Sequence, residues 1–306
     1  MSNAATLART DAPGLLAPAS RAALPFVAPA LLLMGLVILV PACYVLWLSF
    51  HSSTFGVSPT FVGWDNYAKI LQDPYFWRSL VNTAVIVLVV VHAELLLGMA
   101  MAMLFAGGLP GRKVLIACVL APYAVSEVGA IVMWRTLFDP DTGLMMRALA
   151  ALGLPPLEWA VMPSHGLVLV ALLSVWLHLP FTFVILYAAR LAIPIDVYEA
   201  ARIDGASPWQ TFRRVTLPLL APAILVAMLF RYIFAFRLFS EVWLLTGGGP
   251  ARSTAVVAVY LYLEAFRYNN FGAATATGWL MVLSSLVLAG FYLRRLYRGM
   301  FAGLER

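Results

Sequence analysis

The chain has 306 residues, of which 63% are hydrophobic and 11% are charged, and its formal net charge is +6. Because a soluble domain is roughly 45–50% apolar and about 25% charged, this chain holds more apolar side chain than one core can bury. The composition therefore excludes a soluble globular protein and predicts a membrane protein. The positive balance indicates cytoplasmic loops rather than binding of nucleic acid.

Six apolar runs are each long enough to cross a bilayer, which takes ~20 residues. They lie at about 23–50, 81–106, 114–138, 166–191, 217–245 and 271–293. The first run is too long for a signal-peptide core of about 7–15 residues, so we expect it to be retained. The sequence thus predicts an all-α, polytopic membrane protein with six transmembrane helices. Its transmembrane domain is expected at 23–298, between an N-terminal tail at 1–22 and a C-terminal tail at 299–306.

The segments between the runs are short or aromatic. In 51–80, four rings suit the membrane interface, where amphipathic aromatic side chains gather: Trp64, Tyr67, Tyr75 and Trp77. A turn is expected at 139–143, and a short surface helix at 144–152. Cys43 and Cys118 fall inside apolar runs, so we expect packed core cysteines rather than a disulfide.

The distribution of Lys and Arg predicts the orientation. With the N-terminus inside the cell, the cytoplasmic pieces are the two tails and the loops at 107–113 and 190–216. These pieces hold 12 of the 20 basic residues, whereas the external loops hold five. Because cytoplasmic loops carry an excess of Lys and Arg, we expect both termini and the 190–216 loop in the cytoplasm.

A polar segment, 198–218, interrupts the apolar second half of the chain. Asp196 and Glu199 have the spacing of a capping box, and so have Ser207 and Gln210. Gly205 lies between the two boxes, and glycine readily takes the left-handed conformation that ends a helix. The pattern predicts two short helices joined at an angle. Two interpretations remain open: helices that lie under lipid headgroups, or a surface whose small side chains let another protein approach closely.

Eight ionisable side chains fall within or beside the spans, where they are costly and therefore mark candidate functional sites. They are His92, Glu94, Glu127, Arg135, His178, Arg231, Arg237 and Glu241. For each of them the alternative is an ion pair within the membrane or a side chain that reaches the interface. Arg237 and Glu241 are four residues apart in one run, so they are expected to pair on one helix face.

Several motifs along most of 25–295 resemble those of one family. They are EAA (199–201) with glycine at 205 and VTLP (215–218), FVGWDNY (61–67), DPYFWRSLVNT (73–83), WRTLFDP (134–140), AARLAIPIDVYEAARIDGAS (188–207), TLPLL (216–220) and LLTGGGPARST (244–254). The chain resembles the permeases of ABC importers in the carbohydrate-uptake group. It is similar to the first of each permease pair, the type related to the maltose, glycerol-3-phosphate and trehalose systems. Val215 departs from the family, which usually has isoleucine there.

The resemblance implies a mechanism in a bacterial cytoplasmic membrane. This permease would form a heterodimer with a second homologous permease on two cytoplasmic ATPase subunits. A periplasmic or lipid-anchored solute-binding protein would deliver a sugar from outside. Closure of the ATPase pair would turn the cavity outward, which is alternating access about a site near the bilayer midplane.

The coupling loop, 194–216, would insert its helix into a cleft of an ATPase subunit. The residues that the resemblance assigns to this contact are Glu199, Ala200, Ala201, Asp204, Gly205 and Ala206. ATP and Mg would bind to the ATPase subunits, so this chain is expected to be no enzyme and to need no cofactor, metal or catalytic residue of its own. Consistently, the sequence contains no G-x-x-x-x-G-K-[ST] phosphate-binding loop.

Two stretches, 176–181 and 229–250, resemble those that line the sugar site of the maltose permease. The positions carried over are Ser174, Leu177, His178 and Phe181 on the fourth span and Arg231, Phe234, Ala235 and Leu238 on the fifth. Aromatic faces suit the C–H surfaces of a sugar, and a few polar groups suit its hydroxyls. The asparagines of the maltose protein are replaced here, which weakens maltose as the substrate. His178 and Arg231 would add positive charge and tolerate an acidic or phosphorylated sugar.

Two other classes of protein are alternatives to an importer permease. A secondary transporter would need an ion or proton relay, for which Glu94, Glu127 and Glu241 are candidates. However, the sequence has no repeated half, and such a carrier has no use for an EAA loop. An intramembrane enzyme would use Asp139 and Asp141 as metal ligands, but DPDTG is ordinary turn chemistry.

Overall fold

The computed structural model describes residues 17–301, with side chains for 25–294. Its helices are α1 (Ala17–Ser49), α2 (Asp65–Gln72), α3 (Pro74–Ala106), α4 (Arg112–Leu120), α5 (Glu127–Leu137), α6 (Leu144–Ala151), α7 (Pro163–Leu191), α8 (Ile195–Ile203), α9 (Pro208–Thr211), α10 (Leu217–Ala235), α11 (Ser240–Thr246), α12 (Val257–Tyr262) and α13 (Phe271–Phe301). Short turns of tighter or wider helix join some of them: η1 (Ala121–Ala124), η2 (Phe212–Thr216) and η3 (Leu263–Arg267). Strands β1 (His51–Ser52) and β2 (Thr60–Phe61) form a small antiparallel hairpin. Most of the N-terminal and C-terminal tails expected at 1–22 and 299–306 lie outside the described residues.

Five helices are long and apolar enough to cross a membrane. They are Pro25–Ser49, Pro74–Ala106, Pro163–Leu191, Pro208–Ala235 and Phe271–Arg294. The sixth candidate is a bent pair rather than one helix. The all-α membrane fold expected from the sequence is therefore confirmed, with five candidate spans and one bent helix pair among the described residues.

The third expected span, 114–138, is not one continuous helix. The chain forms Arg112–Ala124 and Glu127–Leu137, which meet at an angle of 102°. Pro122 lies in the tight turn η1, and Val125 has an extended backbone. Proline removes a backbone donor and clashes with the preceding turn of an α-helix, so the helix tightens at Pro122 and ends two residues later, at Ala124. Hydropathy does not detect this break because its residues are as apolar as their neighbours.

The expectation of a single fifth span at 217–245 is also wrong. Helix α10 ends at Ala235, and α11 starts only at Ser240, after Phe239 with φ −132° and ψ −59°. Arg237 therefore lies in the break rather than on a helix face with Glu241. The expected pair between them is replaced by a contact between Glu241 and His178.

The second span starts earlier than hydropathy suggests, at Pro74 instead of residue 81. The Asp73 side chain accepts a hydrogen bond from the Tyr75 backbone N–H, and Pro74 occupies the first helical position, where its missing N–H costs nothing. Local capping thus fixes the start of the helix, and the polar residues that follow are simply its first turns. The short surface helix expected at 144–152 is confirmed as α6.

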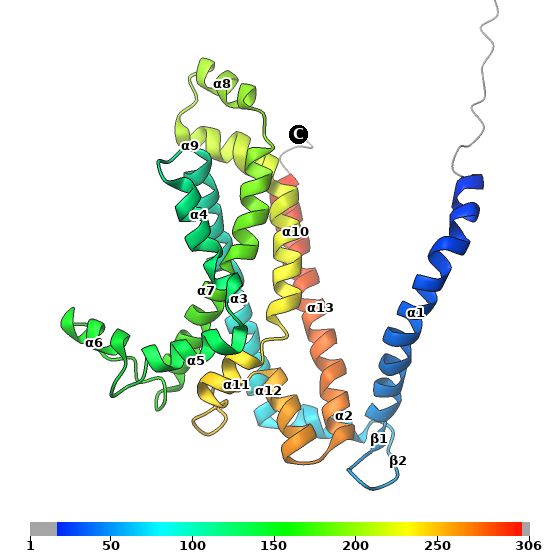
Figure 1. Ribbon diagram of the computed structural model, residues 1–306. Helices are drawn as coiled ribbons and strands as arrows, with labels where there is room; N and C mark the ends of the chain where they lie inside the picture. The colour runs from blue at the N-terminus through cyan, green and yellow to red at the C-terminus, as the bar shows by residue number, and fades with distance from the viewer. Residues whose placement is uncertain (1–16, 302–306) are drawn as a thin grey trace, which may run out of the picture.

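The core lies between α3 and α7, which pack along most of their lengths, with α10 and α13 against them (Figure 1). Gly98 permits this close approach. A Cβ at Gly98 would lie 3.2 Å from the Phe183 backbone nitrogen and 3.2 Å from Thr182 Cγ2. Small residues allow the backbones of membrane helices to come together, where dispersion contacts replace the missing hydrophobic drive.

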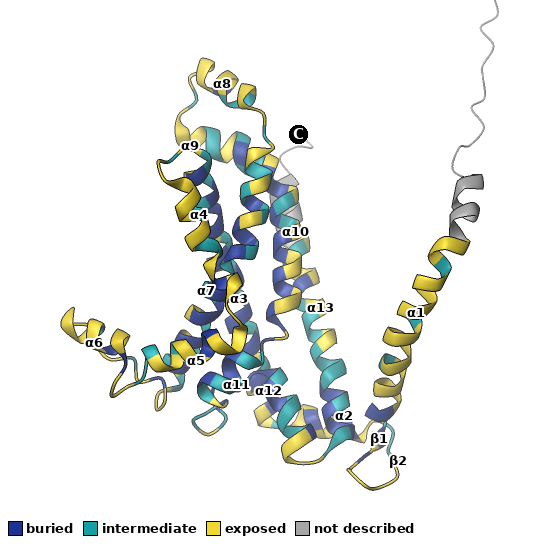
Figure 2. Ribbon diagram, in the orientation of Figure 1, coloured by how far each residue is buried: buried dark blue, intermediate teal, exposed yellow. Residues whose placement is uncertain are grey.

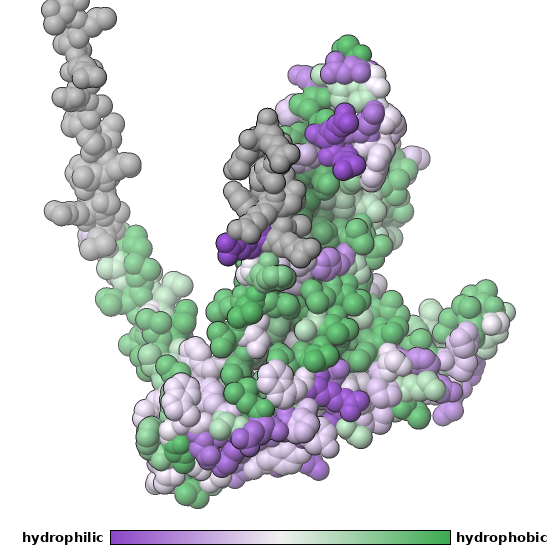
Figure 3. Space-filling model, turned by 180° about the vertical axis from the view of Figure 1, so that it is seen from behind, coloured by the Kyte–Doolittle hydropathy of each residue, from purple (hydrophilic) through white to green (hydrophobic). Residues whose placement is uncertain are grey.

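Most of helix α1 diverges from this bundle (Figure 1), although it contacts α13, and its side chains over 25–49 are mostly exposed (Figure 2). Cys43 on α1 and Cys118 on α4 are both exposed, so the expectation of packed core cysteines is wrong. Figure 3 shows apolar surface over the middle of the bundle and polar patches toward its two ends. This distribution suits a bilayer, because lipid tails and not protein cover the apolar faces.

Candidate functional site

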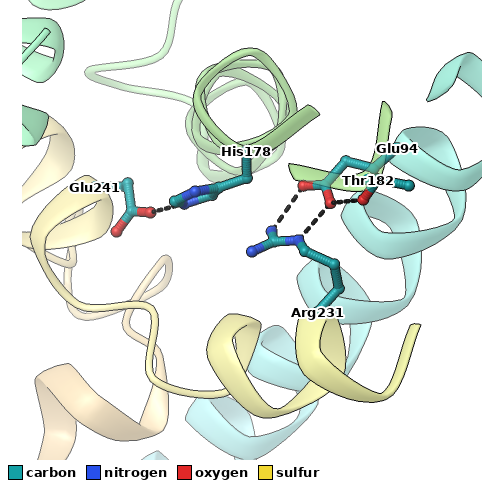
Figure 4. Close-up of polar contacts among 5 residues, drawn as sticks. All are labelled: Glu94, His178, Thr182, Arg231 and Glu241. Atoms are coloured by element: carbon teal, nitrogen blue, oxygen red, sulfur yellow. Dashed lines mark hydrogen bonds and ion pairs between the residues drawn. The ribbon is translucent and has the colours of Figure 1, made fainter. Parts of the chain in front are cut away.

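A network of charged side chains lies inside the bundle, where three helices meet (Figure 4). Glu94 of α3 accepts two hydrogen bonds from Arg231 of α10, at 2.7 Å from Nη2 to Oε1 and 2.5 Å from Nε to Oε2. The Thr182 hydroxyl of α7 donates to Glu94 Oε2 at 3.5 Å. Glu94 is 0% and Arg231 3% exposed. Because an unpaired charge is very costly at this depth, each of these two groups needs the other.

A second polar contact lies beside this ion pair (Figure 4). His178 Nε2 of α7 is 3.2 Å from Glu241 Oε1 of α11. The break after α10 makes this contact, because it turns the chain so that α11 meets α7. Glu241 is 4% exposed, whereas the His178 side chain is 29% exposed.

Six of the eight residues predicted to bind substrate surround one small cavity of about 20 Å³. They are Ser174, His178, Arg231, Phe234, Ala235 and Leu238, and the cavity also touches Ile86, Val90 and Glu241. The other two lie elsewhere: Leu177 is buried in the core, and Phe181 packs edge-on against Phe230 and Phe234. Residues from two spans are therefore brought together as the helical spacing indicated.

This cavity is too small for a sugar, because sites for small molecules have about 300–1,000 Å³. A cavity of 20 Å³ holds about one water. A second hollow of about 200 Å³ shares His178, Phe234, Leu238 and Glu241 with it, and adds Glu127 from the first turn of α5. In this conformation the subunit is closed around its polar network.

Sequence reasoning missed part of this site. The sequence marks Glu94 as a costly polar residue and relay candidate without naming Arg231 as its partner, and it pairs Glu241 with Arg237 instead of His178. Thr182 was not singled out, and neither was Tyr123, which lies beside Phe181 at the break of the third span. The proline in PYA (122–124) is the signal that could have located the break, since discontinuous helices often surround transporter sites.

The predicted coupling residues lie on α8 and in the turn after it, which project from one end of the bundle, at the top of Figure 1. Helix α8 ends in the hydrogen bonds of a Schellman motif: Ala206 N–H donates to Ala201 O at 2.9 Å, and Gly205 N–H donates to Arg202 O at 3.0 Å. Gly205 has φ +73°, a conformation that side chains disfavour. The helix stop expected at Gly205 is therefore confirmed.

Of the two expected capping boxes, one forms. Ser207 accepts from the Gln210 backbone N–H, and its own N–H donates to Gln210 Oε1 at 2.8 Å. The box at Asp196 is wrong, because Pro194 takes the N-cap position and Asp196 lies in the first turn of α8. An acidic residue in a first turn still favours the helix through its dipole.

Most of the predicted coupling residues are free to meet a partner. Glu199, Ala200, Asp204 and Gly205 are exposed, Ala206 is half-buried, and Ala201 is buried. Behind α8, a cavity of about 890 Å³ separates it from the loop at Gly107 and Gly108. The Arg190 guanidinium lies 4.0 Å above the Tyr198 ring and ties α8 to the end of α7.

The acidic turn at 139–143 is held by hydrogen bonds within the turn itself. Asp139 Oδ1 accepts from the Asp141 N–H, the Thr142 N–H and the Thr142 hydroxyl. These hydrogen bonds, first that from the Thr142 backbone, hold the pKa of Asp139 below its usual value. Among the described residues, no group of three or more His, Cys, Asp or Glu is placed to hold a metal ion.

A helical bundle with one broken span, a polar network at its centre and an exposed two-helix elbow at one end defines a membrane permease. The chain matches, over residues 22–302, the family described as Binding-protein-dependent transport system inner membrane component. It belongs to this family and is a multi-pass protein of the inner membrane. The resemblance found in the motifs is confirmed.

Three of the curated relatives that the chain matches over nearly their whole lengths are named as permeases for sugars or a sugar derivative. The chain is 35% identical to the trehalose/maltose transport system permease protein MalF of Thermococcus litoralis, over 89% of this chain and 92% of that protein. It is 35% identical to the trehalose transport system permease protein SugA of Mycobacterium tuberculosis (90% and 88% covered). It is 33% identical to the sulfoquinovosyl glycerol transport system permease protein SmoG of Agrobacterium fabrum (87% and 87%). Each is named as a transport permease rather than an enzyme.

A solved structure shows the same fold. It is a bacterial ABC transporter involved in the import of the acidic polysaccharide alginate, with a TM-score of 0.77 at 21% identity, over 90% of this chain and 96% of that chain. The chain is thus the permease subunit of an ABC transporter.

Proposed function

We propose that this permease carries a sugar inward, as one of two homologous permeases on a pair of ATPase subunits. The observation that carries the proposal is one continuous helix, Pro208–Ala235, of 28 residues. It runs from the Gly205 elbow to the residues around Arg231. At 1.5 Å per residue it is about 42 Å long, so a displacement of the elbow is transmitted along this helix to Arg231.

The coupling contact is proposed to use Glu199, Ala200, Ala201, Asp204, Gly205 and Ala206. The exposure of Glu199 and Ala200 supports this, because small side chains let an ATPase cleft reach the helix backbone. ATP and Mg bind to the ATPase subunits in this proposal, and this chain moves in response to them. The described ends of the chain lie at the same end of the bundle as α8, which supports a cytoplasmic location for both termini (Figure 1).

The sugar is proposed to pass along the surface formed by Ser174, Leu177, His178, Phe181, Arg231, Phe234, Ala235 and Leu238. The names of the relatives support a sugar as the substrate. A binding protein delivers it from outside, since the family is that of binding-protein-dependent systems. The second permease completes a cavity of which this subunit supplies one wall.

The test is ATPase activity and sugar uptake of the complete transporter in proteoliposomes, with its binding protein. Glu199→Lys should abolish co-purification with the ATPase subunit and stop uptake. Glu158→Lys is the matched control, because Glu158 is also exposed and lies on the loop before α7. Normal coupling in the Glu199→Lys variant would overturn the coupling assignment, and uptake without any ATPase subunit would overturn the proposed function.

A further inference from the structure

The Arg231 guanidinium in the site already has an ion-pair partner within this chain. Arg231 donates to both oxygens of Glu94, and Glu94 is completely buried behind it (Figure 4). Thr182 also donates to the same carboxylate. A paired, bidentate guanidinium has satisfied its charge before a ligand arrives. An anionic ligand would have to break this buried pair and leave Glu94 without a partner, which is strongly unfavourable.

The other charged side chains around the two hollows do not give the site a net positive charge. His178 is paired with Glu241. The hollow beyond it is lined by one further carboxylate, Glu127, and one further guanidinium, Arg237. With a neutral His178, the described residues around the two hollows and Glu94 hold three carboxylates and two guanidinium groups. Protonation of His178 would bring this balance only to zero.

One polar atom in the small cavity is unpaired. Ser174 Oγ is buried, with the residue 1% exposed, and it has no hydrogen-bond partner among the described residues. It lines the cavity of about 20 Å³, which accommodates one oxygen-sized group. A buried hydroxyl without a partner is costly, and it both donates and accepts. A hydroxyl of an incoming ligand satisfies it without adding charge.

We propose that this site selects an uncharged sugar over a uronate or a sugar phosphate. In this proposal Glu94 determines the specificity, because it holds Arg231 in a pair and keeps it from binding an anion. Ser174 offers the free hydroxyl. The inference rests on the proposed function, and it reverses the acidic substrate that the positive side chains suggested in the sequence.

The first experiment changes the charge balance without changing shape. Glu94→Gln leaves Arg231 uncompensated, and the double variant Glu94→Gln/Arg231→Gln restores neutrality. Glucuronate is titrated into the detergent-solubilised complete complex by calorimetry. We expect about tenfold tighter binding to Glu94→Gln than to the wild type or the double variant, because a freed guanidinium gains a charge-assisted hydrogen bond. Equal affinities in all three overturn the role of Glu94.

A structural role for Glu94 is distinguished by the double variant. If Glu94 only supports packing, the double variant folds and assembles as poorly as the single variant. If the uncompensated charge is the cause, the double variant folds and assembles, and it binds glucuronate no more tightly than the wild type does. Complex assembly, checked by size-exclusion chromatography, confirms which variants are folded.

The second experiment tests the wild type. The cognate binding protein is screened by thermal shift against neutral mono- and disaccharides, uronates and sugar phosphates, and uptake of each ligand that binds is then measured in proteoliposomes. Binding and uptake of a neutral sugar, with no uronate or phosphate taken up, is the expected result. ATP-driven uptake of an anionic sugar overturns only the selectivity inference. Absence of ATP-driven uptake for every sugar that binds overturns the proposed function itself.

Discussion

Arg231 and Glu94 are 137 positions apart in the chain, yet their side chains form two hydrogen bonds within the bundle. The contact joins α10, which continues from the coupling elbow, to α3, which packs against α7 in the core. It therefore connects the helix expected to move with the ATPase to the helix that forms the body of the subunit. We therefore expect this pair to contribute to both stability and transport.

Removing one partner should destabilise the subunit. Glu94→Ala leaves a buried guanidinium unpaired, which costs about 3–5 kcal/mol. Thermal unfolding of the purified complex should show a clear fall in Tm. Glu158→Ala, on an exposed loop, should stay within about 0.5 kcal/mol of the wild type. An unchanged Tm in Glu94→Ala would mean that water or lipid reaches Arg231.

The close contact of α3 with α7 should be sensitive to a single methyl group. Gly98→Ala places a Cβ 3.2 Å from the Phe183 nitrogen, and backbone there cannot easily move aside. Overpacking of this kind costs about 1–3 kcal/mol. Gly35→Ala in the exposed helix α1 is the control, since its nearest neighbour would be Leu39 Cδ1 at 3.9 Å. Equal Tm values for the two variants would show that the helices separate at little cost.

A comparison of Gly205 with Gly153 distinguishes the effect of backbone strain from an effect on coupling to the ATPase. Gly205 and Gly153 have nearly the same φ, +73° and +70°, and a Cβ at either meets nothing within 4 Å. Alanine at each position should therefore cost a similar ~1–2 kcal/mol of strain. Uptake should fall roughly tenfold only for Gly205→Ala, because a strain of this size at the coupling helix corresponds to about a factor of ten in rate. Equal uptake by both variants would remove the elbow from the mechanism.

The capping box at Ser207 should stabilise the start of the long helix. Ser207→Ala removes the acceptor for the Gln210 N–H and should cost about 1 kcal/mol. Hydrogen exchange should become faster at 208–212 and stay unchanged at the far end of α10. The control is Ser285→Ala, whose hydroxyl is exposed and bonds only within its own helix. Protection that falls along all of α10 would show that the helix unfolds as one unit.

The sequence by itself determined the class of the protein. Composition required a lipid environment, because so much apolar surface cannot be buried in one core. Short-range signals located the coupling segment, since Gly205 and the Ser207–Gln210 box act within one turn of the chain. The motifs indicated the family, and the comparisons confirm it.

Only the tertiary structure decided how the charges are matched. Hydropathy is averaged over a window, so it does not detect the breaks near Pro122 and Phe239. Without the second break, Arg237 and Glu241 would lie on one helix face and would be expected to pair. In the structure no continuous helix joins them. The sequence predicts Arg231 as an added positive charge or as half of an ion pair, and it does not identify the partner, because Glu94 comes from a helix far away in the sequence. Ion pairs in a membrane form between whichever groups the packed helices bring into contact. The fold alone therefore shows that the positive charge in this site is compensated.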